Sequence, residues 1–153
     1  MNNISRQKIE KSICAICWVL MPIYLFYVVS LTLRGRGDAA SSINLTPLYE
    51  LRRAIRSRHH FYWIKQIMGN IALLMPLGIM VPFMLKIMRG PVRIAALAFC
   101  ASLGIESLQL ISGRGIFELD DLMHNTLGAV IGYFIYLSVT EKVLKEESTA
   151  NEE

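Results

Sequence analysis

IESLQLISGRGIFELDDLMHNTLGAVIG, residues 105–132, sets the architecture of the whole chain. It places a carboxylate and an amide one helical turn apart, at Glu106 and Gln109, inside an otherwise apolar segment. A glycine-flanked turn follows, and Asp120 and Asp121 then open a second apolar segment. Because an ionised side chain inside a membrane span costs about 2.5–3.5 kcal/mol even on insertion scales, these residues are candidates for a functional site.

The chain is more apolar than an ordinary soluble domain. Its 153 residues are 54% hydrophobic, against about 45–50% in soluble proteins, and its mean hydropathy is +0.42. Residues 12–33, 66–85 and 122–140 contain no Asp, Glu, Lys or Arg, and residues 94–113 contain only Glu106. Since about 20 apolar residues cross a bilayer as a helix, we predict an all-α integral membrane protein, a four-helix bundle with these segments as its spans.

The remaining residues divide around a single membrane domain. We expect residues 1–11 to form a cytoplasmic N-terminus, residues 12–140 to form the four-span domain and residues 141–153 to form a polar tail. The first apolar segment exceeds the roughly 7–15 residues of a signal-peptide core. An uncleaved first helix is therefore expected.

The long connection between spans one and two predicts an interfacial amphipathic helix. Apolar side chains at positions 48, 51, 55 and 62 fall on one helical face, and arginines at 52, 53 and 56 fall on the other. The segment ends in the aromatic cluster HHFYW, residues 59–63, which is typical of a membrane boundary. The alternative interpretation is a solubilising charged loop.

The count of spans determines which polar residues share a leaflet. A short Gly90-Pro91 turn joins spans two and three as an antiparallel hairpin, so span two begins on the side where span three ends and span four begins. That side holds Asn70, Glu106, Gln109, Arg114, Glu118, Asp120, Asp121, His124 and Asn125. The basic residues of the short loops favour cytoplasmic termini, which places the polar side outward.

Span four carries Gly128 and Gly132 on the same helical face as Asp121 and Asn125. Small residues at this spacing let a neighbouring helix approach closely. We therefore expect a helix contact alongside the polar residues.

Several pieces of the sequence, in this order and spacing, resemble the VanZ-like family of small bacterial membrane proteins. They are Asn44-Leu-Thr-Pro47, Asn70-x-x-x-Leu74-x-Pro76-x-Gly78, Glu106-x-x-Gln109, and Arg114 leading into Asp120-Asp121-x-x-x-Asn125-Thr-Leu-Gly128-x-x-x-Gly132-Tyr133. The chain departs from the family pattern at Leu48, Leu74 and Glu118, and its Arg114 loop is one residue longer. The resemblance implies a multi-pass protein of the bacterial cell membrane. The family is named for a protein that lowers susceptibility to teicoplanin, a lipid-tailed glycopeptide.

Two functions are compatible with these residues. In the first, an outward polar pocket binds a lipid headgroup, a cell-wall precursor or the lipoglycopeptide, and its binding residues are Asn70, Glu106, Gln109, Arg114, Asp120, Asp121 and Asn125. In the second, the protein is a membrane-embedded enzyme acting on a lipid-linked envelope substrate, with Glu106 and Asp121 as candidate acid and base. A third interpretation is that the polar residues only join spans three and four by hydrogen bonds.

Metal binding is the weaker possibility. Glu106, Asp120, Asp121 and His124 offer ligands that suit Mg²⁺ or Mn²⁺, but the chain has no HExxH motif and no dense ligand spacing. We therefore predict no metal site and no cofactor. Membrane lipids are the expected partners, and nucleic acid is not.

Overall fold

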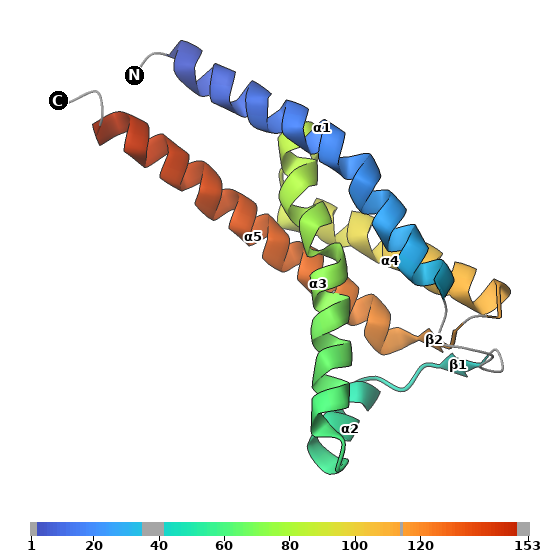
Figure 1. Cartoon of the computed structure of the whole chain (residues 1–153). Coiled ribbons are helices and arrows are strands. Elements are labelled where there is room, and N and C mark those ends of the chain that lie inside the picture. Colours follow the sequence, from blue (N-terminus) through green and yellow to red (C-terminus); the bar gives the residue numbers. More distant parts are fainter. Residues whose placement is uncertain (1–2, 35–41, 114, 150–153) are drawn as a thin grey trace.

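A computed structural model of the chain describes residues 3–34, 42–113 and 115–149 (Figure 1). Its elements are α1 (Asn3–Arg34), β1 (Ile43–Asn44), α2 (Tyr49–Arg56), α3 (His60–Met84), the 3-10 helix η1 (Lys86–Met88), α4 (Pro91–Ile111), β2 (Phe117–Glu118) and α5 (Leu119–Thr149). Helices dominate the described part of the chain, as predicted.

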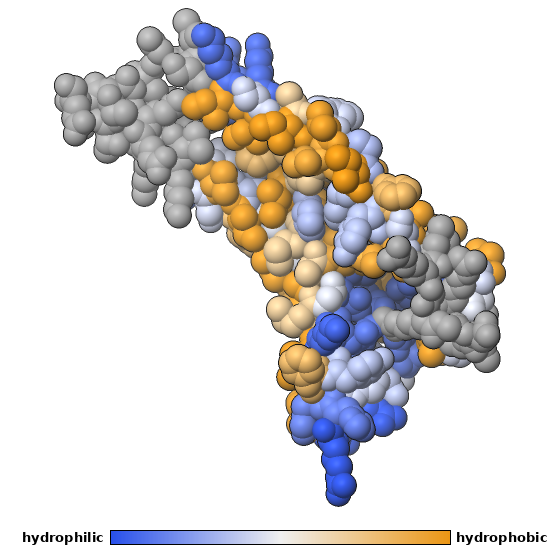
Figure 2. Space-filling model, in the orientation of Figure 1, coloured by the Kyte–Doolittle hydropathy of each residue, from blue (hydrophilic) through white to orange (hydrophobic). Residues whose placement is uncertain are grey.

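Four of the helices are long and apolar enough to cross a membrane. The qualifying segments are Gln7–Thr32, His60–Met84, Pro91–Ile111 and Leu119–Glu141. Figure 2 shows apolar side chains over the middle of the molecule and hydrophilic ones toward α2 and toward the start of α1. The predicted four-helix membrane bundle is confirmed by this architecture.

The bundle has two distinct ends. Helix α1 begins and α5 ends at one of them, while α2, β1 and β2 lie at the other (Figure 1). The polar residues that the count of spans assigned to one leaflet, where the structure describes them, lie around one cavity or contact β1 and α2.

Helices α3 and α5 cross with their backbones in direct contact. A Cβ atom added at Gly128 would lie 1.8 Å from the carbonyl oxygen of Ile71, and one added at Gly132 would lie 2.1 Å from that of Met75. No side chain fits at these distances, so the two backbones touch directly. The predicted close approach along the Gly128 face is confirmed.

The connection between spans one and two differs from the sequence-based expectation in its boundaries. Helix α2 ends at Arg56, and Ser57 is extended, with φ −83° and ψ 151°. The Ser57 hydroxyl accepts a hydrogen bond from the backbone N–H of His59 at 3.0 Å, and α3 begins at His60. Residues 60–65 therefore extend the second span instead of continuing the amphipathic helix.

Helix α2 packs against the bundle through a narrow edge. Glu50 and Ala54, one turn apart, are buried, whereas Leu51 and Ile55 are exposed. The apolar face that the sequence predicts for the headgroup region is thus available to lipid. The one acidic residue of the helix points into the protein.

Two short strands tie α2 to α5. Strands β1 and β2 pair in parallel, with Ile43 opposite Phe117 and Asn44 opposite Glu118, and the N–H of Phe117 donates to the carbonyl of Ser42 at 3.0 Å. No pattern in the sequence predicts this pairing. It brings the start of α2 over the start of α5.

Candidate functional site

A cavity of about 340 Å³ lies between the four spanning helices at the end that carries α2. Every spanning helix contributes to its wall. The lining residues are Leu31, Thr32, Gln66, Gly69, Asn70, Leu73, Ile105, Glu106, Gln109, Asp121 and Asn125. A smaller cavity adjoins it, because it shares Gln66, Gly69 and Asn70 and adds Tyr62 and Lys65.

The cavity brings together most of the residues selected from the sequence. Asn70, Glu106, Gln109, Asp121 and Asn125 all line it. Asp120, which was also selected, is absent from the lining, and Arg114 lies outside the described residues.

Asn125 presents an unused acceptor in this region. Its Nδ2 donates to the Ser102 hydroxyl at 2.9 Å. Its Oδ1 is buried and has no hydrogen-bond partner among the residues that the structure describes. A buried polar atom without a partner costs about 1–3 kcal/mol, so a ligand that donates a hydrogen bond here would recover that energy.

Glu106 joins the cavity wall to the turn beyond α4. The residue is 2% exposed, and its Oε2 accepts a hydrogen bond from the backbone N–H of Glu118 at 3.1 Å. Asn44 in turn donates to Glu118 Oε1 at 3.4 Å. The carboxylate of Glu106 is therefore held in place from the side of β2.

Asp121 is fixed from the opposite helix. The side-chain amide of Asn70, on α3, donates a hydrogen bond to Asp121 Oδ1. The residue is 4% exposed. This contact orients a carboxylate that lines the cavity, and it joins α3 to α5 just beyond their glycine contact.

Asp120 caps α2 from a distant part of the chain. Its Oδ1 accepts from the backbone N–H of Leu48 at 2.7 Å, and its Oδ2 accepts from that of Glu50 at 2.8 Å. The first N–H groups of a helix lack partners within the helix, and a carboxylate there also interacts favourably with the helix dipole. In the structure, Asp120 positions α2 and does not face the cavity.

Glu50 was not selected from the sequence, and His124 was weighed only as a weak metal ligand, yet both lie close to Asp121. His124 Nδ1 and Glu50 Oε2 are 3.2 Å apart, and one ligand atom from each of Glu50, Asp121 and His124 lies within 4.8 Å of the others. The available sequence signal for Glu50 was that it is the only acid in an arginine-rich segment, spaced one turn from a small residue.

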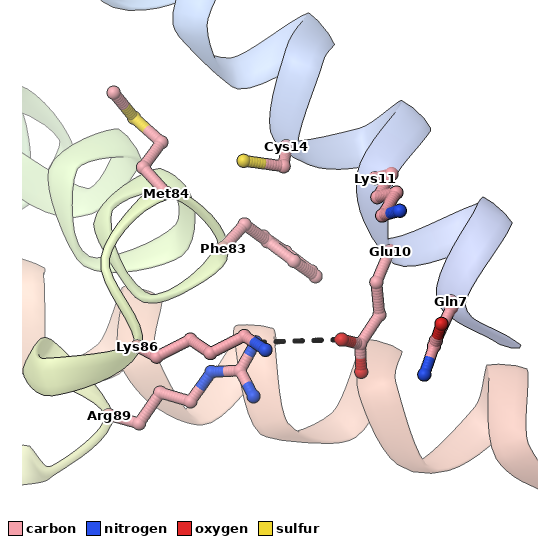
Figure 3. A pocket seen from close by; sticks show the side chains of 8 residues that line it. All are labelled: Gln7, Glu10, Lys11, Cys14, Phe83, Met84, Lys86 and Arg89. Atoms are coloured by element: carbon pink, nitrogen blue, oxygen red, sulfur yellow. Dashed lines mark ion pairs between the residues drawn. The ribbon is translucent and has the colours of Figure 1, made fainter.

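A second cavity, of about 410 Å³, lies at the opposite end of the bundle (Figure 3). Residues of α1 face the turn after α3 across it, and Arg89 pairs with Glu10 at 3.8 Å. Both side chains are about one-third exposed, and exposed ion pairs contribute little. This cavity contains none of the residues selected from the sequence.

Four apolar helices enclosing a polar cavity at one end define a multi-pass helical membrane protein. The chain belongs to the VanZ/LLP1 family, whose model matches residues 12–140. This match confirms the resemblance drawn from the sequence motifs. Searches of curated proteins and of solved structures find no significant match.

Proposed function

We propose that the cavity at the α2 end binds the polar headgroup of a lipid or of a lipid-linked envelope molecule. Through this binding, the protein alters susceptibility to a lipid-tailed glycopeptide of the teicoplanin kind. The main support is the set of polar side chains from α3, α4 and α5 around one cavity, together with the unused acceptor of Asn125.

The volume of the cavity limits the size of the ligand that it can hold. About 340 Å³ lies at the lower end of the roughly 300–1,000 Å³ that small-molecule pockets typically have. That space suits a phosphate-bearing headgroup or one sugar, and it is far too small for a whole glycopeptide. We therefore favour a lipid headgroup or the polar end of a cell-wall precursor over the drug itself.

The composition of the wall fits a molecule with one polar and one apolar end. Leu31, Leu73 and Ile105 line the cavity beside the polar groups. The outer surface of α1 is apolar, with Ile23 and Phe26 exposed at 61% and 75%. A headgroup in the cavity could thus keep its acyl chains against the hydrophobic surface of the bundle.

Basic residues at the α2 end of the molecule favour its attraction to an anionic membrane surface. Lys65 lines the adjoining cavity, and Arg52, Arg53 and Arg56 are exposed on α2. Each basic side chain near an anionic membrane surface contributes about 1 kcal/mol of attraction.

The enzymatic alternative is supported by one observation. Glu106 and Asp121, the candidate acid and base, line the same cavity. Under this alternative, expression of the protein would create a modified lipid, whereas the binding proposal predicts unchanged lipids. Mass spectrometry of lipid extracts separates the two functions.

The experiment measures the inhibitory concentrations of teicoplanin and vancomycin for a susceptible Gram-positive host. Cells express the wild type, Glu106→Gln or an empty vector, and Glu10→Gln serves as the matched control, since it makes the same chemical change at the other cavity. We expect the wild type and Glu10→Gln to raise the teicoplanin value selectively, and Glu106→Gln to lose this effect at equal membrane abundance. No effect of the wild type on either drug would refute the resistance proposal.

A further inference from the structure

Glu50 is the most unusual buried group in the described part of the chain. It is 1% exposed, and neither of its carboxylate oxygens receives a hydrogen bond from a described residue. Burying an ionised carboxylate without hydrogen bonds is costly unless an opposite charge compensates it. Its backbone N–H is tied to Asp120, so the side chain is held at this position.

The nearest side chains supply the remaining parts of a cation site. His124 Nδ1 lies 3.2 Å from Glu50 Oε2 and is likewise buried without a hydrogen-bond partner among the described residues. Asp121 contributes a third ligand atom, and the three atoms lie within 4.8 Å of one another. They come from two elements, α2 and α5, that Asp120 holds together.

We infer that Glu50, Asp121 and His124 bind one divalent transition-metal ion. Two carboxylates and one imidazole, gathered from α2 and α5, form a donor set that a divalent transition-metal ion accepts. Ligands of one ion lie at most about 4.2 Å apart, twice a typical bond length. Side-chain shifts of roughly half an ångström therefore bring all three atoms into range.

The donor set indicates which ions to test. Imidazole suits zinc and other transition metals, and carboxylates suit manganese and magnesium. A mixed set of two carboxylates and one imidazole favours Mn²⁺ or Zn²⁺ over Mg²⁺. This differs from the sequence-based expectation of no metal, because the sequence alone did not place Glu50 beside His124.

The test measures ion binding to the full chain purified in detergent and treated with a chelator. Equilibrium dialysis against MnCl₂ or ZnCl₂ alone, followed by elemental analysis, gives the number of ions per chain and their affinity. We expect one ion per chain, and at least about tenfold weaker binding in Glu50→Gln and in His124→Gln. The control is His59→Gln, which removes an exposed histidine outside the cluster and should leave this ion bound.

Thermal unfolding provides a second test of the ion site, because it compares the stability of each variant with and without metal. Without metal, Glu50→Gln should unfold at or above the wild-type temperature, because it removes a buried charge that lacks hydrogen bonds. Saturating metal should raise Tm in the wild type and not in Glu50→Gln. The proposal is overturned if no ion binds, if Glu50→Gln binds as the wild type does, or if metal-free Glu50→Gln is less stable, which would indicate a simple pair with His124.

Discussion

Replacing Asp120 by alanine should release α2 from the bundle while leaving the four spans intact. The substitution removes two carboxylate hydrogen bonds, of 2.7 and 2.8 Å, to the N–H groups of Leu48 and Glu50. A hydrogen bond to a charged group contributes about 1.5–3 kcal/mol. Because the two bonds share one side chain, we take about 3 kcal/mol for the pair, which is somewhat more than a hundredfold change in an equilibrium constant.

Helix α2 has eight residues, too few to persist without its cap and its contacts. Amide hydrogen exchange measured by mass spectrometry reports its opening. We expect the α2 amides of Asp120→Ala to exchange about a hundredfold faster, with the α3 and α5 amides near Gly128 unchanged. Asp120→Asn retains one acceptor oxygen and should show a smaller increase.

Glu10→Gln controls for the loss of one acidic charge, since Glu10 lies at the other cavity. Unchanged exchange of α2 in Asp120→Ala would refute the capping role. Faster exchange throughout all helices would also refute it, because it would mean that Asp120 supports the bundle as a whole.

Two further predictions concern packing and topology. Gly128→Ala should lower the free energy of unfolding by about 1–3 kcal/mol or more, since its Cβ would meet the Ile71 carbonyl oxygen at 1.8 Å. The control Gly104→Ala has open space around its Cβ and should not lower that free energy. Denaturant titration compares the two variants. The charges of the short loops predict cytoplasmic termini. A fluorescent protein fused after residue 153 should therefore fluoresce, and a phosphatase fused there should be inactive. The reverse pattern would contradict this orientation.

The sequence predicted the spans well because the signal is local. Long runs without charge specify membrane helices one at a time. The antiparallel order of spans two and three then places Asn70 and Glu106 at the same end. The spacing of the glycines in span four was equally informative, because it alone defines the helical face along which another helix can approach. These inferences need only helix geometry and the thickness of a bilayer.

The arrangement of α2 was beyond such reasoning. Asp120 caps a helix whose first residues are about 70 positions earlier, and no periodicity encodes a hydrogen bond across that separation. The inward orientation of Glu50 follows from this cap and from the pairing of two-residue strands, which are too short to leave a pattern. For the same reason Asp120 resembled a ligand-binding residue in the sequence, whereas its carboxylate is occupied by backbone N–H groups.

The central claim is that the cavity at the α2 end is occupied by a ligand, and filling it tests this most directly. Gly69 lines the cavity, and a Cβ there meets nothing within 4 Å, so Gly69→Leu should fill space without disturbing a contact. Gly104→Leu is the matched control, because Gly104 is equally open but lies outside the cavity lining. Teicoplanin susceptibility should return to the empty-vector value in Gly69→Leu and stay at the wild-type value in Gly104→Leu. Wild-type behaviour of both variants at equal abundance would contradict the claim and leave the polar residues as contacts between helices.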